Sequence, residues 1–135
     1  MGVKPMLGRG FLPEENLTPN AHPVVVISYQ VWAEHFNADA GVVGKTLLLN
    51  GEQFTVIGVA PEAFIGSEIY QRHAFWIPAM MGQRFGRSAD WNTNRSSALF
   101  KLYGRLKPGV TMAHAETNLN QVLGSLAERH PRENG

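Results

Sequence analysis

The sequence predicts an α+β fold with a mixed or antiparallel sheet, a central β-hairpin and two main helices at about residues 28–37 and 111–129. An Asn-Gly pair at 50–51 separates two segments with strand character. Two other segments space their apolar residues with helical periodicity. Strand and helix patterns are mixed along the chain and do not strictly alternate, which favours α+β over a doubly wound parallel sheet.

Length and composition indicate one folded domain spanning residues 1–135. The chain has 135 residues, 44% of them apolar and 17% charged, and a net charge of +1. Nucleic-acid-binding proteins typically carry a cluster of basic residues, and this sequence has none, so no nucleic-acid partner is expected. The absence of cysteine excludes disulfides, thiolate catalysis and cysteine-ligated zinc.

The N-terminal third begins irregularly and then forms a strand and a helix. Residues 1–23 are rich in Gly, Pro and Asn, with one helical turn at 13–15. The β-branched run at 24–27 predicts a buried strand. Ser28 follows this run and is expected to cap the next helix by accepting an amide hydrogen bond. Tyr29, Trp32 and Phe36 are spaced as a core-facing aromatic stripe on that helix.

The middle of the chain predicts a β-hairpin. Residues 45–49 and 53–59 have strand character, and Asn-Gly is the strongest short-range signal for a type I′ turn, because both turn residues need positive φ. Both sets of alternating side chains in 53–59 are largely apolar, so we expect both faces of this strand to be covered. Pro61 should end the strand, since proline cannot donate to a ladder.

The last 60 or so residues contain segments with weak and segments with strong secondary-structure signals. Residues 75–77 predict a short strand stopped by Pro78. Residues 82–97 are polar and contain three arginines, and we expect a long solvated loop there. Residues 98–107 alternate with the period of a strand. Thr111 is then expected to cap a helix that ends before Pro131 and whose apolar face consists of Met112, Ala115, Leu119, Val122 and Leu126.

A Gly44-Lys45-Thr46 tripeptide suggests a phosphate-binding loop but lacks its context. That motif requires a glycine five residues before its Gly-Lys pair, and this chain has Asp39 there. A phosphate loop must also open a helix, so that backbone amides point at the phosphate. Here the residues lead into a strand, and we interpret them as a tight turn entering the hairpin.

The other reactive side chains do not form a catalytic pattern. Ser28 lacks the Gly-x-Ser-x-Gly context of a hydrolase nucleophile, and the adjacent Glu14 and Glu15 are interpreted as solvated charges. The histidines follow no metal-ligand spacing; they are His22, His35, His73, His114 and His130. The sequence therefore predicts no catalytic residues, no cofactor-binding residues, no metal ligands and no enzyme activity.

An ordered series of short motifs resembles the MacB-like periplasmic core domain of ABC transporter permeases, of the MacB and FtsX type. The series extends from Gly8 to about Leu126. It consists of Gly8-Arg9-Gly10-Phe11, Pro13-Glu14-Glu15, Val25-Val26-Ile27-Ser28-Tyr29 with Trp32 and Phe36, Val43-Gly44-Lys45-Thr46, Leu49-Asn50-Gly51, Phe54 to Pro61 with Phe64, Trp76-Ile77-Pro78 and Gly104 to Thr111.

The resemblance implies a non-catalytic extracytoplasmic domain that transmits conformational change and contacts a substrate or an adaptor protein. The implied partners are the membrane-spanning remainder of the same permease, a cytoplasmic ATPase acting through that remainder, an adaptor, and a second copy in a homodimer. The implied location is the periplasmic or extracytoplasmic face of the inner membrane.

The sequence lacks the membrane helices of such permeases and an additional N-terminal segment of the family domain. No run approaches the roughly 20 apolar residues that cross a membrane, and residues 1–11 do not form a signal peptide. We therefore expect a soluble fragment of a larger extracytoplasmic domain. A free-standing soluble binding or interaction domain of the same fold is the alternative.

Overall fold

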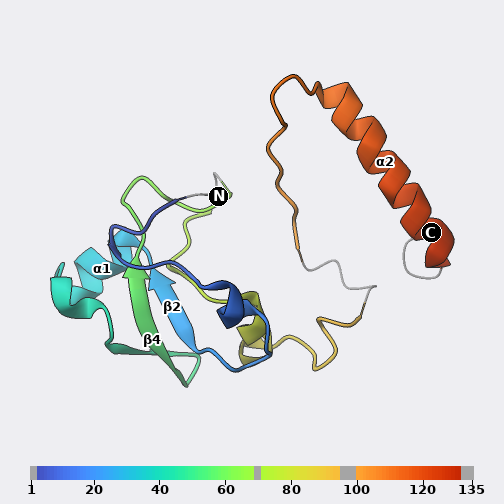
Figure 1. The fold of residues 1–135 in the computed structure, drawn as a ribbon. Coiled ribbons are helices and arrows are strands. Elements are labelled where there is room, and N and C mark those ends of the chain that lie inside the picture. Colours follow the sequence, from blue (N-terminus) through green and yellow to red (C-terminus); the bar gives the residue numbers. More distant parts are fainter. Residues whose placement is uncertain (1–2, 69–70, 95–99, 132–135) are drawn as a thin grey trace. The chain divides into compact units, whose positions relative to one another are not determined.

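The computed structural model describes every residue except 1–2, 69–70, 95–99 and 132–135 (Figure 1). The chain divides into two compact units, residues 1–88 and 89–135, and each is described by itself. Unit 1 is a mixed sheet with helical segments around it, and unit 2 contains one long helix. The predicted α+β class is therefore confirmed.

The sheet of unit 1 is organised around strand β4 (Glu52–Val59), which lies beside β2 (Val24–Ile27) (Figure 1). β4 and β2 are parallel, and all other pairings in this sheet are antiparallel. β1 (Leu7–Gly8) and β3 (Thr46–Leu49) also pair with β4, whereas β5 (Phe75–Trp76) pairs with β2. The strand predicted at 24–27 is thus confirmed, and the strand predicted at 75–77 is confirmed for Phe75–Trp76.

The hairpin between β3 and β4 has the predicted turn. Asn50 and Gly51 have φ values of 53° and 80°, and Leu49 is opposite Glu52 at the end of the ladder. Positive φ at both turn residues is the signature of a type I′ turn, whose twist matches that of the flanking strands. The hairpin follows directly from the local sequence.

A bulge in β4 changes which face its side chains occupy. Val25 pairs with Val56, but Val26 pairs with Gly58, so Ile57 is an extra residue in β4. Without the bulge, residues 56 and 59 would face opposite sides of the sheet. With it, Val56 and Val59 belong to one core cluster and Ile57 to the other.

The two clusters lie on the two faces of the sheet. The larger cluster contains fully buried side chains from β2 and β4, among them Val25, Ile27 and Phe54. The smaller one contains Val26, Ile57 and Ala60. Both faces of β4 are therefore covered over Val56–Val59, as its apolar sequence predicts, whereas Gln53 and Thr55 remain exposed.

Helix α1 (Tyr29–Phe36) covers the larger cluster. Its N-terminus is capped as predicted, because the Ser28 hydroxyl accepts a hydrogen bond from the Val31 N–H at 3.2 Å. Trp32 and Phe36 pack against the core, whereas Tyr29 meets Trp32 edge-on, with ring centroids 5.5 Å apart. The helix ends at Asn37, which adopts the left-handed conformation with φ 54° that often terminates helices.

Short 3₁₀ segments complete unit 1. They are η1 (Pro13–Asn16), η2 (Ala40–Val42) and η3 (Ala79–Phe85). η1 agrees with the helical turn predicted at 13–15. The prediction of a loop across 82–97 is wrong for residues 82–85, because they continue η3, whose Met81 and Gly82 are buried. Residues 95–97 of the predicted loop lie outside the described residues.

Unit 2 contains helix α2 (Met112–Arg129). Thr111 caps it as predicted, with its hydroxyl accepting from the His114 N–H at 3.3 Å, and the helix ends before Pro131. The strand predicted at 98–107 is wrong for residues 100–107, which form no strand. A strand requires a hydrogen-bonded neighbour, and alternation alone does not provide one. Residues 98–99 lie outside the described residues.

Candidate functional site

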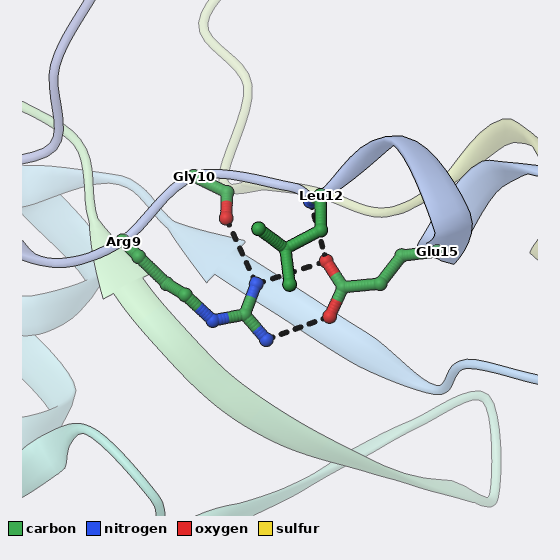
Figure 2. Close-up of polar contacts among 4 residues, drawn as sticks. All are labelled: Arg9, Gly10, Leu12 and Glu15. Carbon is green, nitrogen blue, oxygen red and sulfur yellow. Dashed lines mark hydrogen bonds and ion pairs between the residues drawn. The ribbon is translucent and has the colours of Figure 1, made fainter.

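Arg9 and Glu15 form a paired polar site on the segment that follows β1 (Figure 2). The two nitrogens of the Arg9 fork donate to the two Glu15 oxygens at 2.6 and 2.9 Å, and Arg9 also donates to the Gly10 carbonyl at 2.9 Å. Glu15 is only 5% exposed. The hydrogen bond from Arg9 holds the pKa of the Glu15 carboxyl below its usual value. The interpretation of Glu15 as a solvated charge is therefore wrong.

The local sequence positions Glu15 for this contact. Pro13 begins the η1 turn, the Glu15 N–H donates to the Leu12 carbonyl at 3.1 Å, and the Leu12 N–H donates back to the Glu15 carboxylate at 2.8 Å. Proline at the first helical position and glutamate at the third are a known N-terminal signature. That signal identifies the turn, whereas the pairing with Arg9 depends on how the chain enters it.

The Arg9 backbone connects this site to the sheet. Its N–H donates to the Ile57 carbonyl of β4 at 2.8 Å. The neighbouring pairing of β1 with β4 requires glycine on both strands. A Cβ at Gly8 would collide with the Ile57 carbonyl oxygen, and a Cβ at Gly58 would collide with the Arg9 carbonyl oxygen. The Arg9 N–H and the two glycines therefore hold the N-terminal segment against the central strand, and the Arg9–Glu15 pair holds the turn within that segment.

An apolar hollow lies on the face of the sheet with the smaller core cluster. It has a volume of about 340 Å³, and Val26, Ala60, Phe64 and Trp76 line it, together with Val3, Pro5, Gly10, Phe11 and Pro61. Phe64 and Trp76 face each other with ring centroids 5.1 Å apart. Such a lining suits an apolar side chain or another apolar group of a partner.

A second hollow lies at the beginning of α1 and is more polar. Its volume is about 280 Å³, and its lining carries Glu34, Glu62, Arg72 and His73, together with Ser28, Tyr29, Gln30, Ala33, Phe64 and Ile65. Side chains of both charge signs therefore surround it. This arrangement offers hydrogen bonds to a polar partner.

The residues of the suspected phosphate loop are a turn, as predicted. The Gly44 N–H donates to the Val56 carbonyl at 2.8 Å, so this amide is not free to bind phosphate. The Lys45 amine pairs with the Asp39 carboxylate at 2.5 Å, and Thr46 begins β3. Ser28 likewise serves as a helix cap.

Within the described residues, no group of three or more His, Asp or Glu side chains is arranged to hold a metal ion. The five histidines come from separate segments of the chain. Of the arginines expected in the solvated loop, Arg84 pairs with Glu52 at 2.7 Å, which joins η3 to the hairpin. Arg95 lies outside the described residues.

Comparison with known families identifies the chain. A sequence model of the MacB-like periplasmic core domain matches residues 1–122. The chain belongs to this family. The match agrees with the resemblance that the ordered motifs predicted. No curated protein matches the chain.

MacB-like periplasmic core domains are extracytoplasmic parts of ABC-type permeases and are generally non-enzymatic. Membership in the family therefore associates the chain with the rest of such a permease. Among the helices of the described residues, none is long and apolar enough to cross a membrane.

Proposed function

We propose that this MacB-like domain transmits conformational change on the extracytoplasmic side of an ABC permease and contacts a substrate or an adaptor protein there. The match to the family across residues 1–122 is the observation that carries this proposal. Because the match continues beyond residue 88, it supports treating both units as one domain, which is itself part of a larger extracytoplasmic domain.

The packing of unit 1 supports the mechanical part of the proposal. A domain that transmits motion must move as one body. β4 is hydrogen-bonded to β1, β2 and β3, and its apolar side chains enter clusters on both faces. The Arg9–Glu15 pair adds a charge-assisted link within the N-terminal segment, and the Arg9 N–H bonds that segment to the Ile57 carbonyl of β4. These contacts resist bending of the sheet and favour rigid-body movement.

The apolar hollow supports the contact part of the proposal. Phe11 is 38% exposed and lines the hollow together with Trp76. An exposed apolar depression with aromatic walls is a typical place for an anchor side chain of a partner. The proposed partners are the membrane-spanning remainder of the permease, an ATPase that acts through it, an adaptor, and a second copy of the chain.

Two measurements on the full-length permease test this function. Since the chain has no cysteine, Leu17→Cys at a 71% exposed position introduces a unique thiol within it. We expect a membrane-impermeant maleimide to label this thiol from outside intact cells. Labelling only after the membrane is opened would contradict the extracytoplasmic location.

The contact role is tested by placing a charge in the hollow. Phe11→Asp should reduce transport and substrate-stimulated ATP hydrolysis, because the carboxylate must be desolvated when a partner occupies the hollow. Leu17→Asp is the matched control outside the hollow. Unchanged transport in a folded Phe11→Asp variant would contradict a role for this surface. A full-length gene without membrane segments would favour the free-standing binding domain.

A further inference from the structure

The outer edge of β3 carries backbone groups that point away from the sheet. Leu49 pairs with Glu52 directly at the two-residue turn, which makes this a hydrogen-bonded pair. Hydrogen-bonded and non-hydrogen-bonded pairs alternate along an antiparallel ladder. Leu47 therefore bonds toward β4, whereas the N–H and C=O groups of Thr46 and Leu48 point outward.

Hydrogen bonds on the two sides of β4 agree with this assignment. The Gly44 N–H donates to the Val56 carbonyl at 2.8 Å, on the side of β3, and the Thr55 N–H donates to the Pro23 carbonyl at 2.9 Å, on the side of β2. Residue 56 thus faces β3 and residue 55 faces away. Among the described residues, β3 pairs with β4 alone, so its outward groups have no strand beside them.

This edge lacks the usual protection against pairing. Soluble proteins guard exposed strand edges with charged side chains, prolines or bulges. β3 has the sequence Thr-Leu-Leu-Leu, without charge or proline, and Leu48 is 66% exposed. The nearest charge, on Lys45, is already paired with Asp39.

The inner side chains of β3 extend an apolar surface to the edge. Leu47 and Leu49 pack against the larger core cluster but remain partly exposed. They line a hollow of about 420 Å³ together with Ile27, Val31, His35, Phe36 and Phe75. An added strand would therefore gain backbone hydrogen bonds and cover apolar side chains at the same time.

We propose that a second copy of this chain adds its β3 to this edge in antiparallel orientation, centred on Leu47. In this register, Thr46 of each copy exchanges both backbone hydrogen bonds with Leu48 of the other, so the outward groups are satisfied on both chains. Leu47 meets Leu47 of the second copy at a non-hydrogen-bonded position, where side chains are closest.

The charges of the chain fit a second copy in this register. Lys45 lies opposite Leu49 of the second copy, so like charges do not face each other. The two copies of Lys45 are separated by about 13 Å along the strand direction, at about 3.3 Å per residue. The proposed β3–β3 contact is the interface of the homodimer named under the proposed function. It depends on that function only in placing the dimer within a permease.

Single cysteines test the register in the isolated 135-residue chain, which has no other thiol. Leu47→Cys places the two Cα atoms about 4.5 Å apart across the two-fold axis, within disulfide range. Mild oxidation should give a covalent dimer. Leu49→Cys is the matched control in the same strand, because its two copies are about 13 Å apart and should not cross-link.

Sedimentation equilibrium tests the dimer without any cross-link. Leu48→Lys should weaken dimerisation about tenfold or more, whereas Leu17→Lys, at an equally exposed leucine away from β3, should leave it unchanged. A monomeric wild-type chain at high concentration would overturn the proposal, as would Leu49→Cys cross-linking as readily as Leu47→Cys. Neither measurement depends on transport, so the dimer can be tested even if the proposed permease function proves wrong.

Discussion

The Arg9 guanidinium and the Glu15 carboxylate face each other with two parallel hydrogen bonds of 2.6 and 2.9 Å, six residues apart in the chain. The carboxylate is almost completely buried, whereas the guanidinium is partly open to solvent. The same carboxylate also accepts the Leu12 N–H. Paired, forked hydrogen bonds of this kind are stronger than single neutral ones, so this contact should be measurable in stability.

Glu15→Gln should lower the free energy of unfolding by about 1–2 kcal/mol at neutral pH, because it removes the charge that Arg9 binds. The Glu15 pKa is lowered in the folded chain, so the unfolded chain binds the proton more tightly. The contribution is therefore complete above the unfolded pKa, near 4.3, and is lost as the pH falls through the folded pKa. Urea denaturation between neutral and acidic pH measures both effects.

Glu14→Gln is the control for this prediction, since Glu14 is the exposed neighbour of Glu15 in the same 3₁₀ turn. It should change the unfolding free energy by less than about 0.5 kcal/mol and retain the acid-dependent loss of stability. Equal effects of the two substitutions would show that the Arg9 contact does not contribute.

Gly51→Val should destabilise unit 1 by about 2 kcal/mol, because valine must adopt the φ of 80° that the turn requires. The side chain itself meets no neighbouring atom, so the cost comes from the backbone alone. Gly10→Ala, also without a neighbour and without positive φ, is the control and should have little effect. Urea denaturation of both variants tests this, and equal midpoints would contradict the turn assignment.

The elements that the sequence predicts well are those determined by residues close to one another along the chain. The Asn50-Gly51 turn, the Ser28 cap and the α1 helix are all specified within a few positions. The Arg9–Glu15 pair depends on how the chain enters the η1 turn, and the bulge at Ile57 depends on pairing with β2, which is distant in sequence. Local sequence patterns encode neither. Residues 100–107 show the opposite error, because their alternation satisfies the local condition for a strand, yet the structure describes no strand there.

Phe54→Ala should cost about 3–5 kcal/mol, because the side chain is fully buried in the larger cluster and its removal leaves a cavity. Phe54 also contacts Phe85 of η3, with ring centroids 5.8 Å apart, so the loss should loosen that segment. Thermal denaturation measures the first effect, and hydrogen exchange at 79–85 measures the second. Leu17→Ala, at an exposed position, should leave both unchanged.

Two glycine-to-alanine substitutions should have opposite signs. Gly58→Ala places a methyl group against the Arg9 carbonyl oxygen. This is a backbone atom, and it cannot move away without disrupting the pairing of β1 with β4. We therefore expect a loss of more than about 1 kcal/mol, in the range of overpacking. Gly124→Ala lies within α2, where the added methyl meets no neighbour. It should stabilise that helix by about 0.5–1 kcal/mol, because alanine restricts the unfolded chain and favours helix. Circular dichroism at increasing temperature compares the two variants, and a stabilising Gly58→Ala would contradict the close approach of these strands.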